Sequence, residues 1–477
     1  MLLQSLNNVF SLGNKTPFDL FRIFFDDDII DMIVSNTNIH AGQKNVTFVT
    51  SREQVFRFMG ILFLSGYHTL PQVENYWSVQ PDLGLRIVKQ SMTRHTFRKL
   101  KSFLHLMDNN YIDKSDRFAK VRPLIDLLNK KYKQIGVFAT HLSIDEQMVP
   151  YFGRHNCKMF IRGKPIRFGF KLWCLCSDSG YLFHALPYAG KGSSFDKNIG
   201  LGSSVVLSMI ESIEDPEIHA FYFDNFFTSY YLLCLLNERK IRAIGTVRSN
   251  RLRGANEILQ TGKTLKKHSY DTCFEKTNSI YVCRWQDNSE VTVASNFIAA
   301  EPTQKAVRYS RDEKKKIAIP QPRMICEYNK HMGGVDLHDN AVSNYRIAIR
   351  SKKWWWPLFT NCLNTASVNA WKIHCLIARK ENTKPLSQLQ FKSELTRVLL
   401  MYVEKQPLDI EDSDSDSNTE EEKRERKHPR INVQEHVIRE NPKKRRLRCV
   451  QCQSQTIYQC KKCNVALHLK CFEIFHE

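Results

Sequence analysis

The sequence lacks any apolar run that approaches the roughly 20 residues needed for a membrane-spanning helix. Its first residues, MLLQSLNNVFSLGNK, also lack the basic segment that precedes the apolar part of a secretory signal. We therefore expect a soluble, unsecreted protein that has no membrane partner.

Acidic residues are scarce relative to basic ones. The chain has 49 Asp and Glu residues against 70 Lys and Arg residues, which gives a formal net charge of +21 and a pI of about 9.4. Eight of the acidic residues fall between Asp409 and Glu422, a segment with no Lys or Arg. The rest of the chain is therefore even more cationic, which predicts a polyanionic partner such as a nucleic acid.

The cysteines do not have the spacing of a disulfide framework. Nine of the 14 are scattered at irregular intervals between Cys157 and Cys375, as expected of reduced thiols in a core. The other five fall between Cys449 and Cys471, where their spacing indicates a different role.

Hydrophobic patterning changes along the chain of 477 residues, which is long enough for about three domains. Apolar residues recur at helical spacing up to about residue 140, and short β-branched or aromatic runs begin at His141. Three such runs predict an antiparallel meander, and alternating helices and strands follow it. This order is typical of an α/β fold and fits a ribonuclease H-like sheet.

These patterns divide the chain into seven segments. We expect a mostly helical part (1–140), a ribonuclease H-like core in two parts (141–249 and 323–345) with a β-rich insertion between them (250–322), a second helical part (346–405), an acidic and then basic disordered linker (406–445), and a small cysteine-rich domain (446–477).

Asp224 ends a nearly all-aromatic run in the stretch HAFYFDNFFTS, residues 219–229. A carboxylate in an apolar setting is costly unless it is paired or bound to a metal. One explanation is a helix cap, because Asp224 or Asn225 is suitably placed to begin the helix predicted over Thr228–Lys240. The other explanation is a functional carboxylate.

Two further acids occupy related positions, Asp145 inside the first predicted strand and Asp336 in a later predicted helix. If the three converge, they repel one another unless hard cations such as Mg²⁺ or Mn²⁺ bind between them, and two such ions would catalyse phosphodiester chemistry. Asp339 lies on the same helical face as Asp336 and is a candidate fourth ligand. Glu146 alternates with Asp145 and should point to the other face of the sheet, so we leave it out.

The C-terminal segment holds paired thiols at zinc-ligand spacing. Such pairs indicate Zn²⁺, because so short and polar a segment could hardly fold without a metal. A tetrahedral zinc site takes four ligands, so the seven candidate residues are too many for one site and one too few for two. We expect a cross-braced module with two zinc ions, the eighth ligand being water or a residue outside the run. The candidates are Cys449, Cys452, Cys460, Cys463, His468, Cys471 and His476.

Seven motifs occur in order along nearly the whole chain: SIDEQMVPYFGR, KLWCLCSDSGY, PYAGKG, FDNFFTS, GTVRSNR, YNKHMGGVDLHD and the C-terminal Cys/His cluster. Together they resemble the piggyBac transposase family, which includes the piggyBac transposable element-derived proteins. Four-residue pieces recur by chance, but seven motifs in register are highly specific.

The resemblance implies a cut-and-paste DNA transposase that nicks the element ends, forms DNA hairpins and joins the ends to TTAA targets. The family's catalytic aspartates fall on Asp145, Asp224 and Asp336, and its additional acid on Asp339. The helical parts would form a dimerisation and DNA-binding domain, and the cysteine-rich domain would recognise the DNA of the element ends. Family members usually begin with a longer acidic tail, so this chain is expected to be a truncated or domesticated copy.

Basic residues supply candidate DNA contacts. The stretch GRHNCKMFIRGKPIRFGFK places several cations beside Asp145, and RIAIRSKKWWWP adds a second basic run, in which at least two of the three tryptophans are expected to be core. The candidates are Arg154, Lys158, Arg162, Lys164, Arg167, Lys171, Arg248, Arg251, Arg346, Arg350, Lys352 and Lys353. The run NPKKRRLR, with Lys443–Arg448, predicts a nuclear localisation signal and a phosphate-contacting arm.

Three functions remain open. The first is a nuclear, zinc-containing, Mg²⁺-dependent transposase that acts on double-stranded terminal repeats as a homodimer. The second is a domesticated DNA- or chromatin-binding protein that keeps the acids only by inheritance. The third, a zinc-dependent protein-interaction module of the ubiquitin-ligase type, leaves the basic core unexplained.

Overall fold

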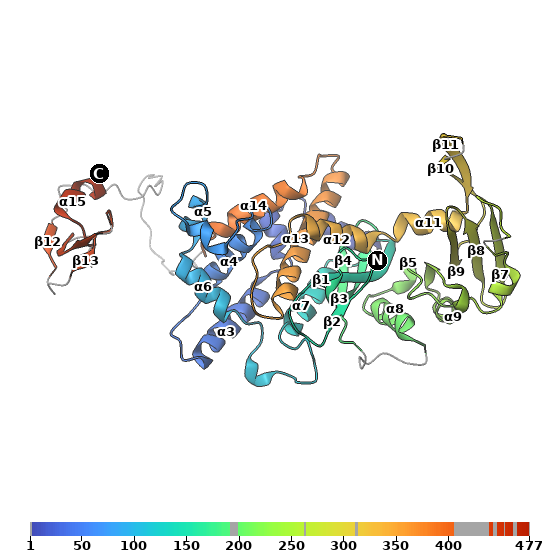
Figure 1. Cartoon of the computed structure of the whole chain (residues 1–477), viewed down its shortest axis with the longest axis horizontal. Coiled ribbons are helices and arrows are strands. Elements are labelled where there is room, and N and C mark those ends of the chain that lie inside the picture. Colours follow the sequence, from blue (N-terminus) through green and yellow to red (C-terminus); the bar gives the residue numbers. More distant parts are fainter. Residues whose placement is uncertain are drawn as a thin grey trace, which may run out of the picture. The chain divides into compact units, whose positions relative to one another are not determined.

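The computed structural model describes residues 2–190, 199–261, 264–310, 313–404, 438–441, 446–452, 454–460 and 465–476, with the backbone alone at 310 and 473–476. The chain forms two compact units, Met1–Lys405 and Gln406–Glu477. Figure 1 shows the helices and strands of each unit.

Helices dominate the first part of the larger unit, as the apolar spacing predicts. Their starts follow from side-chain caps: Thr16 and Asp19 form a capping box at α2, and the hydroxyl of Ser51 accepts a hydrogen bond from the amide of Gln54 at α4. The helices are α1 (Leu2–Phe10), α2 (Pro17–Arg22), α3 (Asp27–Gln43), α4 (Arg52–Leu64), α5 (Arg86–Ser91), α6 (Arg94–Phe103) and α7 (Arg122–Lys133).

A mixed sheet follows and forms the centre of the larger unit. Its strand order is β2-β3-β1-β5-β6-β9-β8-β7, and β4 pairs with β3. Strands β1, β5 and β6 are parallel to one another, whereas β3 and β9 run antiparallel to their neighbours. The strands are β1 (His141–Pro150), β2 (Lys158–Phe160), β3 (Phe168–Ser177), β4 (Leu182–Pro187), β5 (Ala220–Phe223), β6 (Arg242–Thr246), β7 (Tyr270–Glu275), β8 (Ile280–Gln286) and β9 (Glu290–Ser295).

The predicted insertion is not a separate sheet. Strands β8 and β9 pair as a hairpin, and β9 also pairs with β6 and thereby extends the central sheet. Among the described residues of the insertion, β10 (Gln304–Ser310) and β11 (Lys315–Gln321) form a two-stranded sheet of their own, visible in Figure 1 as a ribbon beside the ends of β8 and β9.

Helices cover both faces of the sheet and complete the core of this unit. Between and after the strands lie α8 (Leu201–Glu211), α9 (Tyr230–Glu238), α10 (Ala255–Ile258), α11 (Arg323–His331), α12 (Gly334–Asn344), α13 (Trp356–Lys380) and α14 (Gln388–Leu400). Helices α12 and α13 contact β1, and α8 contacts β3. Trp355 and Trp356 are each 2% exposed, which confirms the expectation that at least two of the three tryptophans belong to the core.

The smaller unit has little regular structure. Its described elements are β12 (Ile438–Glu440), β13 (Leu447–Arg448), β14 (Gln455–Thr456), β15 (Tyr458–Cys460) and α15 (Leu469–His476), and its apolar cluster is centred on three buried residues, Cys449, Cys460 and Leu467. In the part of the chain that the structure describes, no helix combines the length and apolarity needed to cross a membrane.

Candidate functional site

Asp145 and Asp224 lie side by side at the centre of the sheet. Strands β1 and β5 are adjacent and parallel, and their last paired residues are Ile144 and Phe223. Asp145 and Asp224 directly follow this last pair, at the point where β5 ends. Because neighbouring strands lie about 5 Å apart, the backbones of the two acids are close together. This register makes Asp145 and Asp224 neighbours.

Helix α12 brings the other two acids to the same edge, and a glycine permits its approach. A Cβ atom on Gly334 would lie 2.1 Å from the carbonyl oxygen of Ser177 and 2.5 Å from Oγ of Ser143, so only glycine lets the helix start this close to β1 and β3. Asp336 lies in the first turn of α12, where the helix dipole favours a negative charge, and is exposed. Asp339 follows one turn later and is half-buried.

The loop after β5 fixes Asp224 without making it a helix cap. Its Oδ1 accepts a hydrogen bond from the amide of Phe226 at 2.8 Å, and its carbonyl oxygen accepts one from the hydroxyl of Thr228 at 2.8 Å. The residue that caps α9 is Ser229, whose hydroxyl accepts from the amide of Leu232. The helix-cap explanation of Asp224 is therefore wrong.

The electrostatics of the site oppose ionisation of its acids. Burial raises the pKa of Asp145, which is 8% exposed, and the charges of Glu146 and Asp224 raise it further. Burial also raises the pKa of Asp224, and it raises that of Asp339 to about 6. Buried carboxylates with raised pKa values gather at sites where positive charge from a ligand offsets the repulsion.

Lys164 is the cation that faces these acids. Its Nζ lies 3.2 Å from Oε1 of Glu146, and the charges of Asp145 and Glu146 raise its pKa although burial opposes this. Glu146 itself pairs in register with Trp173 on β3, and Nζ of Lys171 lies 3.5 Å from its Oε2. The carboxylates of Glu146 and Asp145 interact with each other, and Lys164 pairs with Glu146 beside the acids. Glu146 therefore reaches this site, and the prediction from strand alternation that it points away from it is wrong.

The donor set fits hard divalent cations. Carboxylate oxygens are the ligands that Mg²⁺ and Mn²⁺ prefer, and four such groups border one edge of the sheet. Among the described residues, no three of these carboxylates have oxygen atoms within 4.8 Å of one another. In this arrangement the four acids do not form a closed cage around a single ion.

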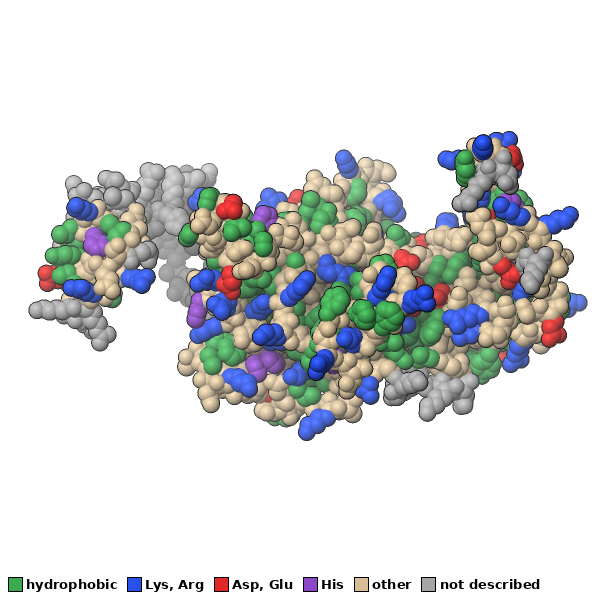
Figure 2. All heavy atoms as spheres, in the orientation of Figure 1, with side chains coloured by type: hydrophobic (Ala, Val, Ile, Leu, Met, Phe, Trp, Pro, Cys, Tyr) green, Lys and Arg blue, Asp and Glu red, His purple; other side chains and the backbone are tan. Residues whose placement is uncertain are grey.

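Most of the basic residues predicted to contact DNA lie on the surface. Figure 2 shows Lys and Arg side chains spread over the visible face of the larger unit, with few acidic side chains among them. Lys158, Lys164, Arg251, Arg346 and Lys353 are half-buried. The exposed residues are Arg154, Arg162, Arg167, Arg248, Arg350 and Lys352.

Three of these cations are engaged inside the protein. Lys171 is buried, and its Nζ lies 3.7 Å from the ring centre of Trp173. Nη1 of Arg251 donates to the carbonyl of Phe226 at 2.7 Å and so braces the loop after Asp224.

Lys353 is the third, and it caps a helix end. Its Nζ donates to the carbonyls of Lys101 and Leu104 at 3.0 and 2.7 Å, at the end of α6, and burial lowers its pKa to about 7.

Two polar residues beside the acids were missed by the sequence interpretation. Nε2 of Gln147 donates to Oδ1 of Asp339 at 2.6 Å, and Nδ2 of Asn361 donates to Oε1 of Gln147 at 3.0 Å. Gln147 was detectable, because a residue two positions after Asp145 on a strand shares its face. Asn361 had no such signal, since nothing local to the sequence places α13 against β1.

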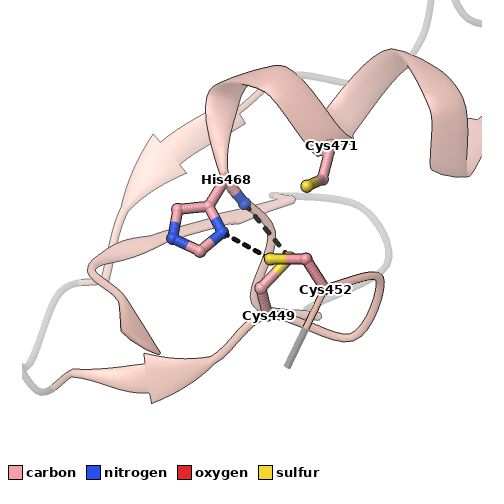
Figure 3. A group of neighbouring side chains, drawn as sticks. All are labelled: Cys449, Cys452, His468 and Cys471. Atoms are coloured by element: carbon pink, nitrogen blue, oxygen red, sulfur yellow. Dashed lines mark hydrogen bonds between the residues drawn. The ribbon is translucent and has the colours of Figure 1, made fainter. Parts of the chain in front are cut away.

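Four of the predicted zinc ligands converge in the smaller unit (Figure 3). The ligand atoms of Cys449, Cys452, His468 and Cys471 all lie within 4.8 Å of one another. Three thiols and one imidazole at this separation suit a tetrahedral zinc ion. In a cross-braced module, the first and third ligand pairs share a site, and these four residues are the first and third pairs.

Hydrogen bonds prepare this cluster for a metal. Nε2 of His468 is 3.0 Å from the carbonyl oxygen of Gln455, which can only accept, so Nε2 carries the proton and Nδ1 faces the thiols. Burial opposes the thiolate form of Cys449, but backbone N–H groups of Cys452 and His468 favour it and lower its pKa to about 6.

The rest of the predicted zinc set is only partly described. Cys460 is buried on β15, whereas Cys463 and the side chain of His476 lie outside the described residues. The acidic segment 409–422 and residues 443–445 of the predicted localisation signal also lie outside them.

Comparison with known proteins identifies a family whose members resemble this chain along most of its length. A family model described as Transposase IS4 matches residues 16–371. The human PiggyBac transposable element-derived protein 3 is 38% identical over 475 residues, 98% of this chain and 77% of that protein. The human PiggyBac transposable element-derived protein 2 is 32% identical over 471 residues, 97% of this chain and 76% of that protein.

A solved structure gives the same result for the fold. A piggyBac transposase in a synaptic complex with hairpin DNA superposes with a TM-score of 0.72 and covers 97% of this chain and 98% of its own, at 22% sequence identity. The mixed sheet, its helices and the Cys/His cluster thus occur in a chain whose sequence relatives are transposon-derived. The chain belongs to the piggyBac family of transposases and transposable element-derived proteins.

Proposed function

We propose that this protein is a DNA transposase that cleaves and joins phosphodiester bonds with two divalent cations held by Asp145, Asp224 and Asp336. One observation supports this most: acids from two adjacent parallel strands and a following helix meet where β5 ends at the centre of the sheet, and burial raises the pKa of Asp145 and Asp224. In this proposal the central strands are the ribonuclease H-like core, and residues 250–322 are its insertion.

Each acid has a separate part in this mechanism. Asp145 and Asp224 present carboxylates from a rigid sheet, so they hold bound Mg²⁺ or Mn²⁺ with little reorganisation. Asp336 adds a carboxylate from the exposed start of α12, and Asp339 adds a fourth from the next turn. When bound, the cations would polarise the phosphate and activate the attacking oxygen.

The DNA substrate fits the distribution of charge. The exposed basic residues would neutralise phosphates, and Lys164 would contact the phosphate nearest the acids. The similar solved structure is titled as a piggyBac transposase complex with hairpin DNA, which supports duplex ends as the substrate here. Recognition of terminal repeats, TTAA targets, a homodimeric assembly and nuclear localisation form part of this proposal.

The smaller unit completes the proposal as a zinc-binding module. Cys449, Cys452, His468 and Cys471 would hold one zinc ion, and Cys460, Cys463 and His476 would contribute to a second. The role we assign to this module is recognition of the DNA of the element ends.

Nicking of a labelled DNA duplex tests the catalytic part. Asp224→Asn should reduce strand cleavage at least about a thousandfold and leave DNA binding intact, because a metal ligand is lost and the cationic surface is not. Asp215→Asn removes an equal charge at a left-handed position that asparagine tolerates, and should cleave like the wild type. Equal cleavage by wild type and Asp224→Asn would contradict the assignment.

A domesticated DNA-binding protein is the second candidate. It is favoured by the names of the two human relatives, both described as transposable element-derived proteins. Strong DNA binding by the wild type without any cleavage in Mg²⁺ or Mn²⁺ would support this candidate over the first.

A further inference from the structure

A buried amide lies next to the candidate catalytic acids. Gln147 is two residues beyond Asp145 on β1, shares its face of the sheet, and is 1% exposed. An unpaired amide at such a position would be destabilising, because each buried polar group without a partner loses the hydrogen bonds that it makes to water in the unfolded chain. Gln147 avoids this cost through partners on two different helices, α12 and α13.

The chemistry of these partners fixes the direction of each hydrogen bond. An ionised carboxylate only accepts, so the amide nitrogen of Gln147 faces Oδ1 of Asp339 at 2.6 Å. The amide oxygen of Gln147 must then face a donor, and Nδ2 of Asn361 lies 3.0 Å from it. Neither amide can be flipped without placing two donors or two acceptors against each other.

Asn361 is itself rigidly held. It is 7% exposed and lies within α13, a helix of 25 residues whose neighbouring turns are buried. The two hydrogen bonds, from Asn361 to Gln147 and from Gln147 to Asp339, therefore connect the core helix α13 to Oδ1 of Asp339. Arg346 and Lys164 add positive charge that favours the ionised form of Asp339, although burial opposes it.

We propose that Gln147 and Asn361 are positioning residues that orient the carboxylate of Asp339 for a divalent cation. The inference rests on the proposed function, because it assigns Asp339 to the metal-binding edge. The hydrogen bond from Gln147 to Oδ1 restricts rotation of the Asp339 carboxylate. The same hydrogen bond thereby fixes the direction in which Oδ2 points. Outer partners of this kind typically change metal affinity about 10- to 100-fold when removed.

Metal binding by the full-length protein with duplex DNA tests this proposal. Mn²⁺ binding, followed by electron paramagnetic resonance, should weaken about tenfold in Gln147→Leu, and the Mn²⁺ concentration for half-maximal cleavage should rise to match. In an Asp339→Asn background, Gln147→Leu should cause no further loss, because the oriented group is already gone.

A matched control separates positioning from general stability. Asn369 lies on the same helix, is fully buried, and pairs with the backbone of Leu182, away from Asp339. Asn369→Leu should lower thermal stability at least as much as Gln147→Leu and leave the Mn²⁺ affinity unchanged. If Gln147→Leu does not fold, Asn361→Ser removes the donor to Gln147 with a smaller change and should also weaken Mn²⁺ binding.

The outcomes distinguish this inference from the proposed function. Wild-type Mn²⁺ affinity in folded Gln147→Leu and Asn361→Ser would overturn the positioning role alone. If Asp145→Ala removes none of the Mn²⁺ binding of the wild-type protein, the proposed function and this inference are both overturned.

Discussion

The two candidate metal centres of this protein are built in opposite ways. The acids of the larger unit lie at the edge of a sheet whose core includes fully buried Trp173, Phe221 and Phe223, so the fold forms first and creates the site. In the smaller unit, two of the three central buried residues are cysteines, one of them a ligand of the cluster. In our proposal, a zinc ion bound there would supply much of the folding free energy of the smaller unit. The comparison teaches that metal removal should affect the two units very differently.

The largest expected effect is selective unfolding by chelation. Removal of zinc should unfold residues 446–477 and leave the unfolding transition of residues 1–405 unchanged, because the larger unit has its own apolar core. Amide hydrogen exchange of the two segments, with the zinc content measured on the same sample, checks this. Cys449→Ser should reproduce the effect, whereas Cys375→Ser, outside the cluster, should not.

If the amides of residues 446–477 stay protected from hydrogen exchange after complete removal of zinc, the claim that the smaller unit depends on the metal for folding would be contradicted. A content of one zinc ion would match the four converging ligands, and a content of two would add a site at Cys460.

A helix contact in the larger unit gives the next largest effect. A Cβ atom on Gly60 of α4 would lie 2.8 Å from the backbone nitrogen of Leu400 on α14, so Gly60→Ala should destabilise this unit by about 1 to 3 kcal/mol. Gly42 on α3 has no atom within 4 Å of such a Cβ, so Gly42→Ala should stabilise by up to about 1 kcal/mol. Denaturant unfolding of both variants measures the difference, and equal effects would show that the core does not determine this unit's stability.

A third expected effect is a pH dependence of the stability of the larger unit. Lys392 is buried and donates to the carbonyl of Tyr345 and to Oδ1 of Asn364, and burial lowers its pKa to about 7. Because the unfolded chain binds this proton more tightly, the free energy of unfolding should rise between pH 7 and about 10. Lys392→Met should reduce this rise, as measured by denaturant unfolding at several pH values, and Lys353, whose pKa burial also lowers to about 7, should account for part of the rise that remains. An unchanged slope in Lys392→Met would show that another group titrates.

Much of the acid site could be predicted from the sequence because its determinants are local. Asp145 lies inside a strand and Asp224 directly follows one, and the aromatic and β-branched runs of the sequence define both strands. Asp336 lies in the first turn of a helix that begins at a glycine pair. Long-range packing was not predictable. Sequence charge could not show that Lys171 and Lys353 are turned inward, because their partners, Glu146 and the carbonyl of Lys101, come from β1 and α6.

The zinc cluster shows the same division between local and long-range information. The CxxC spacing identified ligand types, but the selection of Cys449, Cys452, His468 and Cys471 as one site depended on how β13, β14 and α15 fold together. Likewise, the pairing of β9 with β6 depends on a register that no local pattern specifies.

The central claim is that the acids of the larger unit catalyse transposition. Excision from a donor plasmid that carries the chain's own flanking genomic repeats tests it most directly, with wild type beside Asp145→Ala and the repaired junctions sequenced. The account predicts seamless TTAA junctions with the wild type and none with Asp145→Ala, because loss of one carboxylate removes a metal ligand. Equal excision by both would contradict the role of Asp145, and no excision by a wild-type protein that still binds the repeats would contradict transposase activity.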